Sequence, residues 1–366
     1  MDLPLKGIRV IEFAGLAPGP FAGLILADFG ADVIRIDRVK SNSTDFLARG
    51  KRSIALDVKS EKGKEILHRL TKQADILIEP YRPGIMEKLG FGPEVICKNN
   101  PRLIYARLTG YGQTGDYSRE AGHDINYLAI SGVLSAMGRS GEKPMFPINY
   151  LADFAGGSLI CVIGILMALY ERGRSGLGQV IDAAMVDGVG YLSTFLSELI
   201  KHGAHGNGRG NNLLDGGAPF YEVYETLDGK HMAVGAIETQ FYRELITGLE
   251  LDPDSLPDQY DTPSWPRIRG IFQQRFRQKS QDEWTAIFKN SDACVTPVLS
   301  MEHSLNPAPA PVLSRTPVHR NENSPSFLPP GKHSMEILKE IGYHSGEIDE
   351  LEQSQVIQSD KLSSNL

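Results

Sequence analysis

Two residues whose side chains could exchange protons, His123 and Asp153, each stand near the start of an apolar segment. His123 lies in AGHDINYLAISGVL (residues 121–134), and Asp153 lies in LADFAGGSLICVIGILMALYERGR. A polar residue before an apolar run is typical of a helix start, where Asp is a favoured cap. Imidazole and carboxyl groups are also common general acids and bases in enzymes. Each residue is therefore either a structural residue at a helix start or half of a proton-transfer site.

A third candidate, Glu238, follows a predicted β-hairpin. The sequence APFYEVYETLDGKHMAVGAIE contains Asp228-Gly229, a dipeptide that favours tight hairpin turns. Glu238 precedes the apolar positions of residues 241–246, so we expect it to cap a helix there. Taken singly, none of the three residues identifies a function, because an isolated histidine is most often a buried, hydrogen-bonded structural residue.

The first 150 or so residues predict the sheet that would position these side chains. A strand at 7–13, a helical pattern at 15–30 and a second strand at 32–38 have the spacing of a βαβ unit. An amphipathic helix at 62–74 and further strands in DILIEPY and LIYARLTGYG continue the alternation. We therefore predict a Rossmann-like open parallel sheet with helices on both faces. Its first turn, Gly15-Leu-Ala-Pro-Gly19, lacks the G-x-G-x-x-G pattern, which argues against a nicotinamide cofactor.

The remaining sequence predicts a second, smaller domain. Residues 218–300 combine the hairpin with helical patterns, which indicates an α+β unit. The Gly/Asn-rich segment 201–217 and the Pro-rich segment 301–317 flank it as linkers. The large domain is then residues 1–200, with 318–366 returning to it.

Composition limits the classes of partner. The formal net charge of −7 argues against nucleic acid, although a local group of basic residues could still bind a small polyanion. The most apolar stretch, residues 159–170, is expected to be too short to cross a membrane. The last three residues, Ser364-Asn365-Leu366, are similar to the small-basic-Leu address of peroxisomes but lack the basic residue. The cysteines lie too far apart for a disulfide framework or a multi-cysteine zinc site, and they fit a reducing compartment: Cys97, Cys161 and Cys294.

Several long motifs, in this order, resemble the family III CoA-transferase superfamily. They are GLAPGPFAGLILADFGADVIRID, RGKRSIALDVK, RLIYARLTGYGQTG, GHDINYLA, LADFAGG, GLGQVIDAAMVDG and LDGGAPFY. The resemblance runs from Leu5 to about Tyr343 and is closest to the α-methylacyl-CoA racemase branch. It implies interconversion of (2R)- and (2S)-2-methylacyl-CoA thioesters without a cofactor. It also implies branched fatty acyl or bile-acid-type substrates that enter β-oxidation, in peroxisomes or mitochondria.

The resemblance assigns roles to the three candidates. Asp153 matches an aspartate that is the covalent nucleophile of the transferases and a proton donor and acceptor in the racemases. His123 matches a histidine of the racemases, where transferases usually have tyrosine, and Glu238 matches the acid that supports it. Proton transfer on two faces of carbon 2 through an enolate needs two groups that share roughly one proton. Asp153 must then carry a proton at neutral pH, so burial has to outweigh the helix dipole.

Further residues are expected to contact the CoA moiety or line the site. By resemblance, Arg38, residues 55–58 and residues 122–127 contact CoA, and Asn149 and Tyr221 support the proton-transfer site. Arg82, with Arg38, Arg49, Lys51 and Arg52, could bind the CoA phosphates, or these residues could form a solvated charge cluster. Backbone N–H groups beside Gly122, Gly156 and Gly157 could hold the enolate oxygen. The complete set of expected contact residues is Arg38, Ala55, Leu56, Asp57, Val58, Arg82, Gly122, Asp124, Ile125, Asn126, Tyr127, Asn149 and Tyr221.

Two other functions remain open at this point. A family III CoA-transferase would use Asp153 to form an acyl anhydride, and the histidine at position 123 speaks against this. A CoA-binding protein without catalysis would not need His123, Asp153 and Glu238 together. The resemblance further implies an interlocked homodimer, in which Glu238 reaches the His123 of the partner chain.

Overall fold

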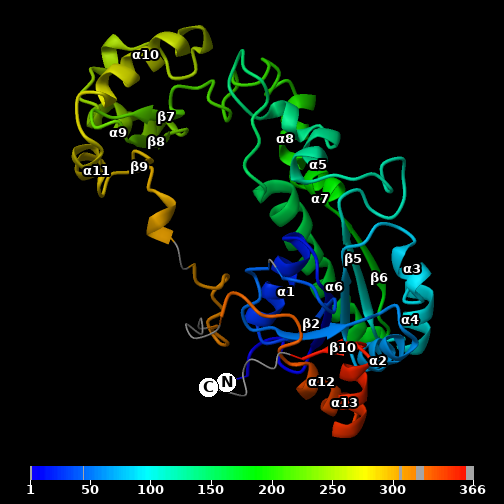
Figure 1. The fold of residues 1–366 in the computed structure, drawn as a ribbon. Coiled ribbons are helices and arrows are strands. Elements are labelled where there is room, and N and C mark those ends of the chain that lie inside the picture. Colours follow the sequence, from blue (N-terminus) through cyan, green and yellow to red (C-terminus); the bar gives the residue numbers. More distant parts are fainter. Residues whose placement is uncertain (1, 44, 305–306, 319–324, 360–366) are drawn as a thin grey trace. The chain divides into compact units, whose positions relative to one another are not determined.

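The computed structural model describes residues 2–43, 45–304, 307–318 and 325–359 (Figure 1). The chain forms two compact units. The first unit comprises Met1–Ser131, Pro147–Leu192 and Ala308–Leu366, and the second comprises Gly132–Phe146 and Ser193–Pro307. The C-terminal tripeptide 364–366 lies outside the described residues.

The first unit is built on a seven-stranded sheet of order β10-β3-β2-β1-β4-β5-β6. All neighbouring strands are parallel except β10, which pairs antiparallel with β3. The run 3-2-1-4-5-6 is the strand order of doubly wound nucleotide-binding folds, so the expected Rossmann-like sheet is confirmed. The strands are β1 (Arg9–Phe13), β2 (Asp32–Asp37), β3 (Arg52–Leu56), β4 (Ile76–Glu79), β5 (Ile104–Thr109), β6 (Val180–Ala184) and β10 (Ile357–Gln358).

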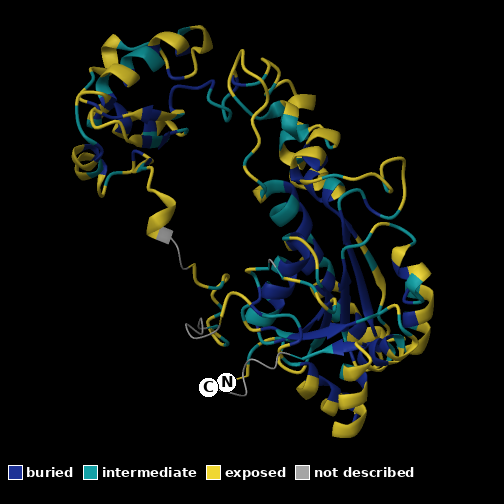
Figure 2. Cartoon of the chain, in the orientation of Figure 1, coloured by how far each residue is buried: buried dark blue, intermediate teal, exposed yellow. Residues whose placement is uncertain are grey.

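Helices cover both faces of this sheet, whose strands are almost entirely buried except for the first half of the edge strand β6 (Figure 2). One face packs against α2 (Glu61–Lys72), α3 (Ile85–Leu89), α4 (Pro93–Asn99), α12 (Ser334–Glu340) and α13 (Ser345–Gln353). Helix α2 begins where the Ser60 side chain accepts the N–H of Gly63, and it buries Ile66, Leu67 and Leu70 at helical spacing. The other face packs against α1 (Pro18–Asp28) and α6 (Ile160–Ser175).

Helix α6 continues a π-helical segment, η2 (Tyr150–Leu159). Asn149 is the cap residue of η2, so Asp153 lies inside the first turn instead of capping the helix as expected. Together the two segments form a helix of 26 residues, Tyr150–Ser175, which by length and composition could cross a membrane. The expected limit of 159–170 was therefore wrong, because the helix starts earlier. Its packing on β5, β6 and α7 (Met185–Leu192) is that of a helix covering a sheet.

The backbones of helix α7 and η2 are in direct contact at Gly188 and Gly156. A Cβ on Gly188 would lie 1.9 Å from the carbonyl oxygen of Gly156, and a Cβ on Gly156 would lie 2.8 Å from the backbone nitrogen of Val189. Two short helical segments precede this layer in the sequence: α5 (Asp124–Ile130), which packs on η2 and α7, and η1 (Val133–Ala136). Glycine at 156 and 188 thus permits the contact that fixes η2.

The second unit contains a three-stranded antiparallel sheet, β7-β8-β9. The predicted hairpin is present, since β7 (Tyr221–Glu225) and β8 (His231–Gly235) flank the Asp228-Gly229 turn, and β9 (Val295–Pro297) pairs with β8. The helices that accompany this sheet are α8 (Thr194–Lys201), α9 (Thr239–Gly248), α10 (Trp265–Phe276) and α11 (Gln281–Phe288), with 3-10 turns η3 (Pro253–Ser255), η4 (Thr262–Ser264) and η5 (Met301–Ser304).

Residues 132–146 group with the second unit, although the sequence placed them in the large domain. The reason is a set of contacts with the loop that precedes β7. Arg209 donates to the carbonyl oxygens of Ser135 and Glu142, and Arg139 forms an ion pair with Glu222 at 3.5 Å. Such contacts join segments about 70 residues apart, so local patterning does not reveal them.

We expect Gly188→Ala to lower the free energy of unfolding by about 1–3 kcal/mol, the usual cost of inserting an atom into a packed contact. Gly190→Ala is the matched control, because it lies in the same helix and its Cβ would meet nothing within 4 Å. The control should be neutral or stabilising by up to about 1 kcal/mol, since Ala favours helix over Gly. Urea unfolding measures both. Equal stabilities of the two variants would contradict the proposed backbone contact.

Candidate active site

The starts of α5 and η2 are joined by one carboxylate. Asp124, which is 4% exposed, accepts the N–H of Ala152 at 2.7 Å and the N–H of Asp153 at 2.8 Å through Oδ2. Because Asp124 follows His123 directly, this contact brings the histidine and Asp153 into the same region. The structure therefore unites the two residues that lie thirty positions apart in the sequence.

The Asp153 carboxyl is partly buried and accepts a hydrogen bond from the Asn149 Nδ2 atom at 3.0 Å. Burial raises the pKa of this carboxyl above its usual range. The Asn149 hydrogen bond and the positive charge of His123 lower the pKa, whereas the negative charge of Asp124 raises it further. The direction of the pKa shift is the one expected from the sequence, because burial outweighs the effects of Asn149 and His123. The protonation of Asp153 at neutral pH stays a prediction.

His123 is exposed, which overturns its interpretation as a buried structural residue. It occupies the cap position of α5, and its backbone N–H donates to Oδ1 of Asn126 at 3.1 Å. The Tyr127 hydroxyl donates to the Gly122 carbonyl, and the ring of Tyr127 packs edge-on against Tyr111. Burial, aided by the Asp153 charge, raises the pKa of Tyr127 to about 12. These contacts fix the backbone on both sides of the imidazole.

The glycines expected to present N–H groups to an enolate also permit close packing. Gly156 and Gly157 are buried, and Gly157 has no room for a Cβ beside the Ala152 carbonyl and the Met185 side chain. Gly122 likewise faces the rings of Tyr111 and Tyr127. Packing therefore accounts for glycine at positions 156 and 157, and a role of their N–H groups in holding the enolate oxygen stays a prediction.

A second feature of the first unit is a cavity of about 440 Å³ beyond the carboxyl ends of β1 to β4. From β1 the chain continues to β2 on one side of the sheet, and from β4 it continues to β5 on the other side. Doubly wound sheets bind nucleotides at the crevice between two such strands. Burial raises the pKa of Tyr81 in this cavity, and the adjacent Arg38 guanidinium lowers it. Leu56, Asp57 and Val58 line the cavity together with its cationic residues Arg38, Lys59 and Lys88.

Ala55 and Arg82 are not among the residues that line this cavity, and their expected contact with CoA stays a prediction. Ala55 is buried in β3, where its N–H donates to the Ser334 hydroxyl at 3.2 Å and β10 pairs alongside. Arg82 is exposed and donates to the Arg119 carbonyl at 2.8 Å. Its charge lowers the pKa of Tyr127, so Arg82 lies toward the His123 segment instead.

The other basic residues considered for phosphate binding are held in ion pairs. Lys51 is 5% exposed and bonds both Glu12 oxygens, at 2.8 and 2.9 Å, and the Pro20 carbonyl. Burial raises the pKa of Glu12 to about 7, against the opposing effect of Lys51. These ion pairs favour a structural role for Arg49, Lys51 and Arg52 over phosphate binding. The carboxylate partners are Asp28 for Arg49, Glu12 for Lys51, and Asp32, Glu336 and Glu340 for Arg52.

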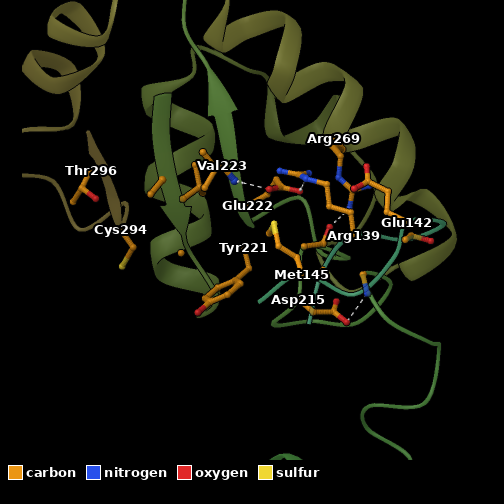
Figure 3. A pocket seen from close by; sticks show the side chains of 17 residues that line it. Arg139, Glu142, Met145, Asp215, Tyr221, Glu222, Val223, Arg269, Cys294 and Thr296 are labelled. Atoms are coloured by element: carbon orange, nitrogen blue, oxygen red, sulfur yellow. Dashed lines mark hydrogen bonds and ion pairs between the residues drawn. The ribbon is translucent and has the colours of Figure 1, made fainter. Parts of the chain in front are cut away.

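The second unit holds Glu238 and Tyr221. Glu238 is the cap residue of α9, as expected from sequence, and its side chain is exposed. Tyr221 begins β7 and lines a cavity of about 760 Å³ within this unit. In that cavity Arg139, Glu222 and Arg269 lie together on one side (Figure 3).

Within the part of the chain that the structure describes, His, Cys, Asp and Glu side chains form no group of three that could hold a metal ion. The polar side chains described at the α5–η2 junction include an imidazole, a carboxyl group and the amide that bonds it.

The sequence matches the model of CoA-transferase family III over residues 5–311. The chain belongs to this family. It is 52% identical to alpha-methylacyl-CoA racemase of Mus musculus over 382 residues, which cover 99% of the chain and 100% of the relative. Succinyl-CoA:glutarate CoA-transferase of Mus musculus is 29% identical over 97% of the chain and 90% of its own length. A CAIB/BAIF family protein from Brucella suis has the same fold, with a TM-score of 0.78 at 24% identity over 93% of this chain and 100% of that one.

Two contacts of this family III chain were not predicted. Asp124 was expected to contact CoA, which stays a prediction, but the bonds from the N–H groups of Ala152 and Asp153 to its Oδ2 were not foreseen. The Ser158 hydroxyl donates to the carbonyls of Pro18 and Asp153, at 2.8 and 3.0 Å, and so ties the site to α1. The only signal for the first contact was the acid beside His123. The second has no signal in the local sequence.

Proposed function

We propose that this chain is a racemase that interconverts (2R)- and (2S)-2-methylacyl-CoA thioesters. The observation that carries the proposal is the pairing of His123 with a partly buried Asp153 whose pKa is raised. The 52% identity to a full-length racemase supports the same activity. By the family resemblance, the acyl chains are branched fatty acyl or bile-acid-type chains on their way to β-oxidation.

The reaction proceeds by proton transfer on both faces of carbon 2. One member of the pair removes the α-proton, which leaves an enolate, and the other returns a proton to the opposite face. The pair works with one proton between its members, so neutral His123 requires protonated Asp153. A raised Asp153 pKa favours the protonated form of this carboxyl group. No metal or redox cofactor enters the proposed scheme.

The alternative within the family is a CoA-transferase in which Asp153 attacks the thioester. That reaction needs an ionised carboxylate as nucleophile. Burial of Asp153 disfavours the ionised form, and His123 adds a second proton carrier that acyl transfer does not need. Both features favour the racemase.

The cavity beyond β1 to β4 is our proposed site for the nucleotide part of CoA. Its position at the strand ends and its cations, including Arg38, suit a phosphorylated nucleotide. We propose that residues 122–127 guide the thioester to the proton-transfer pair. By the family resemblance, peroxisomes, mitochondria or both are the proposed location.

Incubation of a 2-methylacyl-CoA in D₂O without an acceptor acid tests the activity. We expect loss of optical purity together with incorporation of α-deuterium. His123→Ala and Asp153→Ala should each lower kcat at least 100-fold, the lower range for general acid–base catalysis, while CoA binding is retained. Transfer of CoA to an added acceptor acid, without incorporation of α-deuterium, would instead identify a transferase.

Arg38→Ala should raise KM for acyl-CoA more than it lowers kcat, because a phosphate contact is equally present in ground and transition states. Arg49→Ala is the control, since Arg49 is already paired with Asp28 at 2.5 Å. Steady-state kinetics and calorimetric binding of CoA measure both variants. Unchanged CoA affinity in Arg38→Ala would remove this cavity from the proposed site.

We further propose that the chain acts as a homodimer. An exposed apolar stripe on η2 and α6 supports this, because apolar side chains at helical spacing along one face favour association. The stripe consists of Leu159, Ile163, Leu166, Met167 and Tyr170, with exposed fractions of 43% to 69%. By the family resemblance, Glu238 of one protomer would support His123 of its partner.

Mixed dimers of His123→Ala and Glu238→Ala chains test the shared site. If sites are shared, each mixed dimer contains one doubly altered site and one intact site, so activity returns to a level that neither parent shows. Light scattering and tagged co-purification verify the mixed dimers. A monomer in solution, or verified mixed dimers without recovered activity, would refute the arrangement.

A further inference from the structure

The carboxylate of Asp124 is placed unusually for a residue that only caps a helix. Its Oδ2 accepts two N–H groups, from Ala152 and Asp153, that belong to a different helical segment from its own. Its Oδ1 is buried and has no hydrogen-bond partner among the described residues. A buried oxygen without a partner is costly, so its retention calls for an explanation.

The explanation lies in the charge that this oxygen carries. The hydrogen bonds at Oδ2 come from neutral amides, and within the described ranges no ion pair to Asp124 is present. The negative charge is therefore incompletely compensated and close to the Asp153 carboxyl, whose affinity for a proton it increases. Asn149 acts on the same carboxyl in the opposite sense, because its Nδ2 donor favours the ionised form.

Few other charges reach this carboxyl. His123 lowers its pKa, and Tyr127, which faces it from α5, is neutral at physiological pH because its own pKa is about 12. Helices α1, α6 and α7 and strands β5 and β6 also pack on η2. The remaining titratable or charged residues on η2 and on these elements are Tyr150, Asp28 (paired with Arg49), Tyr105, Arg107 (paired with Glu79 and Glu87), Cys161, Tyr170, Glu171, Arg172 (paired with Asp75), Arg174, Asp182, Asp187 and Tyr191.

We propose that Asp124 is a positioning residue that anchors the backbone of Asp153 and, through its uncompensated charge, keeps the Asp153 carboxyl in its proton-carrying form. The hydrogen bond from Asn149 opposes the effect of the Asp124 charge, because it stabilises the ionised Asp153 carboxylate. The Asp153 carboxyl can therefore also release its proton. The pair is thereby set to exchange one proton with His123 in either direction. This inference rests on the proposed racemase function for its consequence, but not for its test.

The first experiment titrates the Asp153 carboxyl by NMR with ¹³C-labelled aspartate, in a His123→Ala background that leaves one member of the pair. Asp153→Asn assigns the signal. Asp124→Asn keeps an oxygen that can accept the two N–H groups but removes the charge, and the Asp153 titration should move to lower pH by about one unit. Asn149→Ala should move it to higher pH. This measurement needs no activity, so it stands even if the racemase proposal fails.

The second experiment uses the chain with His123 intact and follows kcat/KM against pH. A negative charge favours the protonated pair, so its removal lowers the pH at which the pair loses its proton. In Asp124→Asn the alkaline limb should therefore shift to lower pH, with a roughly tenfold loss of kcat/KM above the limb for a shift of one unit. In Asn149→Ala the alkaline limb should shift upward.

Opposite shifts in the two variants support the proposal, because a loss of packing alone would not give opposite signs. An Asp153 titration that is unchanged in Asp124→Asn overturns it, as does a uniform loss of kcat with an unchanged pH profile. Asp124→Ser, which is neutral and keeps one acceptor, provides a second variant if Asn is not tolerated. Failure of both neutral variants to fold, judged by circular dichroism, would assign Asp124 a purely structural role and would also overturn the proposal.

Discussion

The carboxylate of Asp124, hydrogen-bonded to the N–H groups of Ala152 and Asp153, is the contact on which the site depends. It joins the starts of two helical segments whose own hydrogen bonding leaves such N–H groups without intrahelical partners. An ordinary N-cap side chain accepts an N–H group of its own helix. Here Asp124 of α5 accepts two N–H groups of η2, and the residue before Asp124 is His123. The carboxylate of Asp124 satisfies N–H groups at the start of η2, and this contact places His123 and Asp153 in the same region.

The π-helical winding of η2 has a related origin. Its first turn is held by Asp124, its glycines lie against α7, and Ser158 bonds the carbonyl five residues earlier as well as the carbonyl of Pro18. Segments with i→i+5 hydrogen bonds are rare and occur frequently at functional sites. In this chain the winding sets the direction in which the Asp153 side chain leaves the helix.

The sequence predicted the sheet well where strands are rich in β-branched and other large apolar residues, as in β1, β4 and β5. It missed β3, because that strand starts with Arg52 and Ser53, and it missed β10, which has only two residues. His123 and Asp153 could be singled out by type and by family motif, but their proximity depends on a contact across about thirty residues. The ion pairs of Arg52 with Glu336 and Glu340 involve partners nearly 290 residues away, so the sequence could not distinguish a phosphate cluster from a structural network.

The C-terminal segment 308–366 belongs to the first unit, so this unit can be completed only late in translation. Strand β10 covers the outer edge of β3, and the buried Arg35 donates to the Leu328 carbonyl as well as to Asp37 and Asp45. The second unit, by contrast, is encoded entirely before this segment. On the ribosome the smaller unit can therefore complete its core first. The larger sheet keeps an open edge, and Arg35 lacks its Leu328 partner, until the last part of the chain emerges. Nascent chains stalled before Leu328 should accordingly be the most dependent on chaperones.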